Sequence, residues 1–355
     1  MLPEDINSAI NEARRELIIC NSCRYCEGYC DVWDAIERKT EFSKNDIFHF
    51  SNLCHDCREC FYVCPFVEPH EYKLNIPKAL SKVRQYSYQE FSTPKKMSWV
   101  YNKMSLLTLL LTIAAIAVLF SFFALSHGFS SFTGHYVGIL QAIPISTFKV
   151  ISIAIYVYVL SLWSVEGYLY WRAIKNDNSI KFSSILAAAW DVIWHKNFRG
   201  GSAGCNYPTE DSKKSRLYFH PLVFFGFIID WVSIIFYPFT NNLVFWIYTV
   251  GSAMIFIGAS SLLYMKLVSN KTLENLDMRK IDFPFTVLLL LAGLTGMVFP
   301  LLLSYPEWVI VFLLHDAFIF SIFILAPYSK FMHPIYRYIS LIRNRIEDVK
   351  DIWNA

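Results

Sequence analysis

Long uncharged stretches fill the chain from Met104 onward, whereas the first 103 residues contain no apolar run longer than a few residues. An apolar run of about 20 residues crosses a bilayer as a helix, because its rise matches the hydrocarbon thickness. Three shorter runs reach that length across a single carboxylate, at Glu166, Asp230 or Asp316. The pattern predicts six transmembrane helices, near residues 104–126, 149–172, 217–239, 243–265, 283–304 and 307–328.

A shorter segment, residues 180–196, has a different period. Its apolar residues recur at helical spacing, and Trp190 and Trp194 lie four residues apart. A short helix with one apolar face lies in the membrane interface instead of crossing it. We therefore expect an amphipathic helix on the membrane surface here.

The first 103 residues are strongly polar. They hold 14 Lys and Arg, 15 Asp and Glu, and eight of the nine cysteines. The segment between Cys30 and Cys54 contains helix formers and few runs of β-branched residues, so we expect it to be helical. The sequence thus predicts an all-α protein, with a helical two-cluster ferredoxin-like domain in residues 1–97 and a six-helix membrane domain in residues 98–355.

Composition and charge support a membrane location. Only 17% of the residues are charged, against about a quarter in a soluble domain. The formal net charge of +3 is too nearly balanced to indicate a nucleic-acid partner. Lys and Arg in short loops stay on the cytoplasmic side, and 31 of the 32 lie on one side of the six-helix arrangement, with Lys149 near the other. We expect a multi-pass inner-membrane protein with both termini and the cysteines in the cytoplasm.

Eight cysteines form two copies of the spacing C-x2-C-x2-C-x3-C, and Pro65 follows the second copy. This is the spacing of two-cluster bacterial ferredoxins, in which the fourth cysteine of each copy ligates the other cluster. The predicted ligands of one [4Fe–4S] cluster are Cys20, Cys23, Cys26 and Cys64. Those of the second cluster are Cys54, Cys57, Cys60 and Cys30. Zinc sites lack a third cysteine at this spacing, and disulfide bonds are rare in the reducing cytosol.

Six short segments along the chain have distinctive sequences, namely Cys20–Cys30, Asn52–Arg58, Pro69–Pro77, Gly204–Pro208, His220–Phe227 and Pro327–His333. Together they resemble the citrate or tricarballylate utilisation B protein family, and the resemblance covers nearly the whole chain. It implies a membrane iron–sulfur protein that reoxidises the FAD of a partner dehydrogenase acting on tricarballylate. That flavoprotein would dock on the cytoplasmic face.

Histidines in or beside the predicted spans are candidate haem ligands, because ionisable residues in a membrane are costly and imidazole ligates haem iron. His220 begins the third span, His315 lies in the sixth, and His333 follows it. By depth His220 matches His333 better, which predicts a haem b between them, with His315 as the alternative partner. His127 or His135 could hold a second haem with His315, but both are more typical of plain loop residues. Contact with lipid headgroups is the alternative role for His220 and His333.

The carboxylates in the spans have several open roles. Glu166, Asp230 and Asp316 could bind quinone, carry protons or pair with a neighbouring polar group. Structural pairing is the favoured role for Asp230. For Asp316, beside His315, a proton or quinone role is as strongly expected as a structural one.

No hydrolase motif and no dinucleotide-binding fingerprint occurs in the chain, so the organic chemistry is expected in the partner. The sequence predicts an electron conduit from the partner's reduced FAD, through two clusters and haem b, to membrane quinone. A conduit without haem and a membrane redox sensor are the two rival functions.

Overall fold

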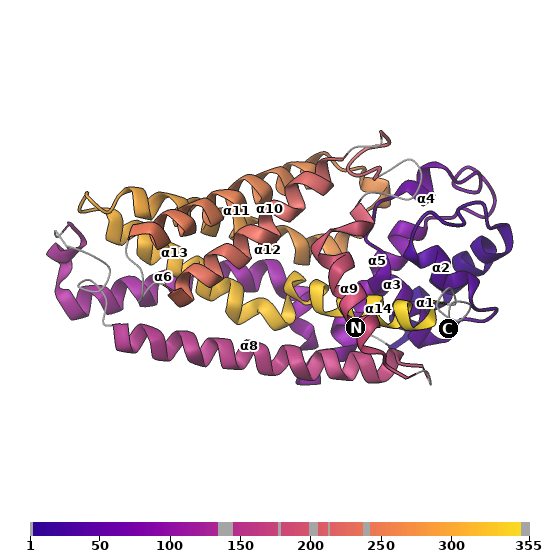
Figure 1. The fold of residues 1–355 in the computed structure, drawn as a ribbon, viewed down its shortest axis with the longest axis horizontal. Coiled ribbons are helices and arrows are strands. Elements are labelled where there is room, and N and C mark those ends of the chain that lie inside the picture. The colour runs from indigo at the N-terminus through magenta and orange to yellow at the C-terminus, as the bar shows by residue number, and fades with distance from the viewer. Residues whose placement is uncertain are drawn as a thin grey trace.

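A computed structural model describes residues 3–133, 145–176, 179–198, 205–211, 214–236 and 242–348. Over these residues every regular element is a helix, as the sequence predicts. Long helices run side by side along the molecule, and the cysteine-bearing N-terminal segment forms a body at one end (Figure 1). The first helix and the last helix both lie at this end.

The N-terminal body consists of short helices around the cysteines. They are α1 (Pro3–Cys23), α2 (Asp31–Glu37), α3 (Lys44–Leu53), α4 (Glu59–Tyr62) and α5 (Ile76–Phe91). The predicted helical connection between Cys30 and Cys54 is therefore confirmed. Ser43 fixes the start of α3, because its Oγ accepts a hydrogen bond from Asp46 N while Asp46 Oδ2 accepts one from Ser43 N.

The membrane part contains long helices close to the predicted positions. They are α6 (Met104–His127), α8 (Ile145–Ile174), α10 (Ser215–Phe236), α11 (Asn242–Val268), α12 (Leu276–Leu301) and α13 (Trp308–Leu325). A 3-10 segment, Lys95–Lys103, leads into α6, and another, Ala326–Tyr328, follows α13. The start of α12 lies before the predicted residue 283, because its first turn is polar and Asn275 Oδ1 accepts a hydrogen bond from Asp277 N.

Five helices of the described chain are long and apolar enough to cross a membrane, not the six that the sequence predicts. The five segments are Lys95–His127, Val150–Ile174, Leu243–Val268, Leu276–Leu301 and Trp308–Tyr328. The predicted third span corresponds to α10, whose polarity is raised by Arg216, His220 and Asp230. The end of that prediction, residues 237–239, lies outside the described residues.

Helix α10 nevertheless packs tightly along α11, a candidate span. Glycines permit this close approach. A Cβ added at Gly226 would lie 2.6 Å from the carbonyl oxygen of Gly251, and one at Gly258 would lie 2.8 Å from that of Phe219. Both distances are shorter than a carbon and an oxygen tolerate, so the two backbones meet through these glycines.

The predicted surface helix is α9 (Phe182–Ile193), and it packs against the last helix, α14 (His333–Glu347). Two of its apolar side chains, Phe182 and Trp190, are 72% and 63% exposed. Arg345 on α14 donates a 2.9 Å hydrogen bond from Nε to Asp191 on α9. The apolar side chains of Phe182 and Trp190 are therefore not covered by α14, and the location of α9 in the membrane interface stays a prediction.

The N-terminal body is fixed to the membrane helices by side chains from both parts. Arg343 on α14 pairs with Asp46 on α3 at 2.5 Å, and Arg58 Nη1 donates a 2.8 Å hydrogen bond to Ser269 Oγ in the connection between α11 and α12. Tyr328 donates a 2.8 Å hydrogen bond to the carbonyl oxygen of Thr93. These contacts hold the cysteines against the end of the helix bundle.

Candidate functional site

Two neighbouring cavities in the N-terminal body are lined by cysteines. The first lies between the end of α1 and the segment after α4, and its cysteines are Cys20, Cys23, Cys26, Cys60 and Cys64. The chain turns sharply between the first-motif cysteines, with a positive φ at Arg24 (56°) and at Gly28 (77°). These turns bring three thiols of one short segment to the same cavity wall.

The second cavity lies between the ends of α2, α3 and α4. Its cysteines are Cys30, Cys54, Cys57 and Cys60. Asp56 and Arg58 adopt positive φ angles of 56° and 67°, which turn the chain around this cavity. Cys60 and Trp33 line both cavities, so the two are adjacent.

The distribution of thiols matches the crossed pairing expected from the motif. Cys64 of the second motif lies with Cys20, Cys23 and Cys26, and Cys30 of the first motif lies with Cys54 and Cys57. The structure therefore brings each predicted ligand set together at one cavity, with Cys60 at the wall between the two. The ligand assignment itself stays a prediction.

The surroundings of the thiols disfavour their ionised form. Within the described residues, no three side chains of His, Cys, Asp or Glu approach closely enough to hold a single ion. Burial raises the pKa of the Cys26 thiol to about 12, and the nearby Cys64 and Cys23 reinforce this. Burial likewise raises the pKa of Cys20, and Cys64 adds to the effect. Thiols that resist ionisation together become thiolates when a cationic centre sits among them.

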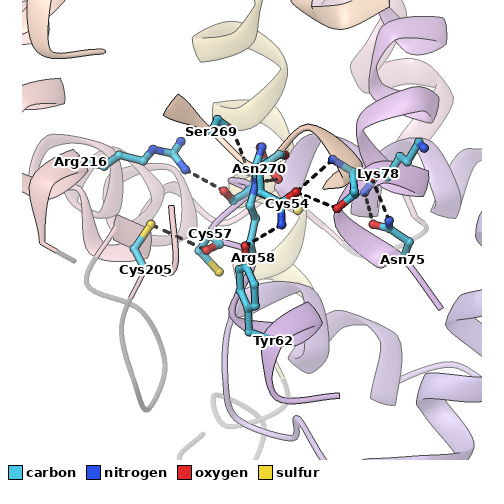
Figure 2. A network of polar contacts seen from close by, with 12 residues as sticks. Cys54, Cys57, Arg58, Tyr62, Asn75, Lys78, Cys205, Arg216, Ser269 and Asn270 are labelled. Carbon is cyan, nitrogen blue, oxygen red and sulfur yellow. Dashed lines mark hydrogen bonds and ion pairs between the residues drawn. The ribbon is translucent and has the colours of Figure 1, made fainter. Parts of the chain in front are cut away.

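Arginines surround the second cavity. Arg216 Nη1 donates a 2.8 Å hydrogen bond to the carbonyl oxygen of Asp56, and the Arg58 guanidinium lies 4.5 Å from the centre of the Tyr207 ring. Figure 2 shows Arg58 and Arg216 on either side of Cys57. The ninth cysteine, Cys205, is buried beside them, with its Sγ 3.9 Å from the carbonyl oxygen of Cys57.

The structure also brings two of the predicted haem ligands together. The rings of His220 and His333 have their centres 6.2 Å apart and lie at 83° to each other. A third histidine, His195, lies beside them with its Nε2 3.1 Å from His220 Nδ1. Sequence reasoning missed His195, although it stands near the end of the predicted 180–196 helix, directly after Trp194.

His315 lies apart from this group. Its Nδ1 donates a 3.0 Å hydrogen bond to the carbonyl oxygen of Ala292, and its Nε2 accepts one of 2.5 Å from the Tyr248 hydroxyl. Both ring nitrogens are therefore engaged within the helix bundle. His127 stacks on Phe123, and the other possible partner, His135, lies outside the described residues.

The buried carboxylates have local hydrogen-bond donors. Ser252 Oγ donates a 2.7 Å hydrogen bond to Asp230, and the backbone N–H of Thr93 donates one of 2.8 Å to Glu166. The contact of Asp230 is the kind of structural pairing expected from the sequence. Asp316 is buried beside His315.

Comparison with known proteins accounts for both parts of the chain. Residues 13–90 match the Citrate utilization protein B Fer4-like domain, and residues 100–352 match the Citrate utilization protein B family. The chain belongs to the Citrate utilization protein B family. The expected family is thereby confirmed, and the Fer4-like match includes all eight motif cysteines.

A curated member of the Citrate utilization protein B family, from Escherichia coli, is 29% identical over 355 residues, covering 95% of this chain and 92% of the relative. No solved structure matches the chain. The family match, the cysteines of the Fer4-like domain and the long apolar helices together describe an iron–sulfur protein of citrate utilisation with several candidate membrane helices.

Proposed function

We propose that this chain carries electrons from a flavoprotein dehydrogenase in the cytoplasm to quinone in the membrane. The observation that carries the proposal is the pair of adjacent cysteine-lined cavities, the second of which faces the membrane helices. A [4Fe–4S] cluster, when bound, accepts and releases one electron at a time. The residues of this chain would hold two such clusters close together, between the aqueous surface and the bilayer.

The two cavities differ in exposure, which gives the proposed path a direction. Cys23 is exposed and Tyr25, which lines the first cavity, is 61% exposed. Two residues that line the second cavity are bonded to the membrane part, because Asp56 accepts a hydrogen bond from Arg216 and Arg58 donates one to Ser269. The partner would therefore dock over the first cavity. Its substrate would be tricarballylate or a related tricarboxylate, as the resemblance to the citrate or tricarballylate utilisation B protein family implies.

We further propose that His220 and His333 ligate a haem b. Backbone carbonyls fix the protons of the neutral rings. His333 Nδ1 donates a 2.6 Å hydrogen bond to the carbonyl oxygen of Lys330, and His195 Nδ1 donates one of 3.1 Å to that of Ile193. His195 Nε2 must then accept a hydrogen bond from His220 Nδ1 at 3.1 Å. Both His220 and His333 keep the lone pair on Nε2 for a metal.

The spacing of the two rings supports the same role. The two imidazole rings have centres only 6.2 Å apart, so both residues could hold the same haem iron. Bound haem would supply a one-electron acceptor between the cluster domain and quinone.

The membrane arrangement that we propose has six crossings, with α10 as the third. Its close contact with α11 through Gly226 and Gly258 supports an antiparallel course of the two helices through the bilayer. The basic residues would then place both termini and the cysteines in the cytoplasm, where a soluble dehydrogenase docks.

The test is reconstitution of the full path. Membranes that contain this chain, mixed with the partner dehydrogenase, should reduce quinone on addition of tricarballylate, and neither protein alone should do so. The Cys57→Ala variant should stop quinone reduction, while Cys205→Ala should leave it intact. Quinone reduction by a preparation that contains no haem would support the haem-free conduit. Absence of quinone reduction, with intact clusters and an active partner, would support the redox sensor.

A further inference from the structure

We propose that arginines around the second cavity give its cluster a higher reduction potential than the cluster in the first cavity. Electrons would then run downhill from the exposed cavity to the one that faces the membrane. This inference rests on the proposed function, because it requires a cluster in each cavity. It adds the direction of electron flow between the two clusters and names the residues that set this direction.

Two arginines converge on the backbone of Cys54. Arg84 on α5 donates hydrogen bonds from Nε to the carbonyl oxygen of Ser51 at 2.6 Å and from Nη2 to that of Cys54. Arg337 on α14 donates a 2.7 Å hydrogen bond from Nη2 to the same Cys54 oxygen. Both guanidinium charges are thus held beside a predicted iron ligand.

Two more arginines lie at Cys57. The guanidinium groups of Arg58 and Arg216 lie 4.5 Å and 4.8 Å from the centre of the Tyr207 ring. Arg58 is 2% exposed and is held by Ser269, while Arg216 donates to the carbonyl oxygen of Asp56 (Figure 2).

Acidic groups offset only part of this charge. The Asp56 carboxylate lies 3.6 Å from Arg58 Nε, and Glu59 is buried at the wall of the second cavity. Asp31, next to Cys30, pairs with Lys196 at 3.1 Å. Counting these groups, four arginines and one lysine face three carboxylates, so the second cavity has a positive surround.

The first cavity has the opposite character. None of the described residues that line it is charged. A buried carboxyl nearby belongs to Glu16, whose Oε2 accepts a 2.9 Å hydrogen bond from Asn75 N. Burial raises the pKa of Glu16 to about 7, and its ionised form acts on Cys20 and Cys64. Reduction adds a negative charge to a cluster, so a positive surround favours it and a carboxylate opposes it.

The membrane part supplies half of these arginines. Arg216 lies in the first turn of α10 and Arg337 lies on α14, whereas Arg58 and Arg84 belong to the N-terminal body. The membrane helices therefore act on the second cluster directly, by placing two guanidinium groups against it. An isolated ferredoxin-like domain would lack this contribution.

The test is a redox titration of the full-length protein in detergent, followed by electron paramagnetic resonance. Arg337→Gln and Arg216→Gln should each lower the equilibrium constant for reduction of the higher-potential cluster tenfold or more. This corresponds to a fall in its reduction potential of about 59 mV for one electron. The lower-potential signal should not move. Arg279→Gln is the matched control, because Arg279 pairs with Glu274 at 2.7 Å and lines neither cavity.

Two further variants assign the signals and guard against misfolding. Arg337→Lys keeps the charge and should shift the higher signal less than Arg337→Gln. Glu16→Gln keeps the hydrogen bond from Asn75 N and should raise the reduction potential of the lower-potential cluster only. A Cys57→Ser variant that alters the lower signal, or arginine variants that move both signals equally, would overturn the proposed order. Absence of any cluster signal in the unmodified protein would instead overturn the proposed function.

Discussion

Arg337 and Cys54 join the last helix of the chain to the second cavity, with a 2.7 Å hydrogen bond from Nη2 to the carbonyl oxygen across 283 residues of sequence. One helical turn before Arg337, the same helix carries His333. The helix that presents a proposed haem ligand therefore also contacts the backbone of a predicted iron ligand. A short, rigid link of this kind suits electron transfer between the two centres.

The cysteines provide the first prediction. Two [4Fe–4S] clusters contain eight iron atoms, so anaerobically purified protein should hold about eight iron and eight sulfide per chain. Cys57→Ala should lower both toward about four, because Cys57 lies only at the second cavity. Cys205→Ala is the control and should keep all eight, since Cys205 lines neither of the two cavities. Zinc in place of iron would contradict the assignment.

The histidines provide the second prediction. His220→Ala or His333→Ala should abolish the reduced haem bands and leave the cluster signals intact. His195→Ala should retain haem with a changed potential, because His220 Nδ1 loses its hydrogen-bond acceptor at 3.1 Å. His315→Ala serves as a matched control and should keep the haem, since both His315 nitrogens are bonded elsewhere. Loss of haem only in His315→Ala would transfer the ligand role to that residue.

The helices and the cysteine grouping were the features most accessible from sequence. Apolar runs mark buried helices whatever their neighbours, and the fixed cysteine spacing reflects the shape of the cluster it holds. Helix starts were less accessible, because the first turn of α12 is polar and only its Asn275 cap reveals it. Local patterns carry this kind of information and little about distant contacts.

The contacts that His195 and the arginines make with distant segments could not be predicted. His195 joins His220 only because the surface helix α9 packs on α14, and the arginines reach Cys54 from α5 and α14. The spacing of apolar residues along the chain gives no information on such packing. The pattern also did not settle whether α10 crosses the membrane, because this helix carries Arg216, His220 and Asp230 and is not among the five candidate spans of the described chain.

Membrane topology provides the third prediction, and it separates six crossings from five. With α10 as a crossing, reporter fusions after residue 97 and after Ala355 should both report cytoplasm. A fusion at residue 241, between α10 and α11, should report the opposite side. With five crossings the two fusions outside the bundle would lie on opposite sides of the membrane, and α10 would lie against the bundle without spanning.

The fourth prediction concerns the ion pairs that hold α14 on the N-terminal body. Asp46 pairs with Arg343 at 2.5 Å and with Lys39 at 2.6 Å, and it is 7% exposed. Asp46→Asn leaves the buried Arg343 without this partner, so it should lower the stability by about 3 kcal/mol. The apparent Tm in detergent measures this. The control is Asp277→Asn, which removes an exposed pair with Lys280 and should leave the Tm unchanged.

The pH dependence of this effect follows from the same contacts. Burial alone would raise the pKa of the Asp46 carboxyl, but hydrogen bonds from Lys39, Ser43 and Arg343 hold it well below its usual range. A carboxyl whose pKa is lowered in the folded state contributes its full stabilisation above the pKa of the unfolded chain, which is about 3.9. The contribution falls as the pH drops below that value. The Tm gap between the unmodified protein and Asp46→Asn should therefore stay constant from pH 8 to about pH 5 and narrow below about pH 4. A gap that narrowed already between pH 8 and 6 would assign the stabilisation to another group.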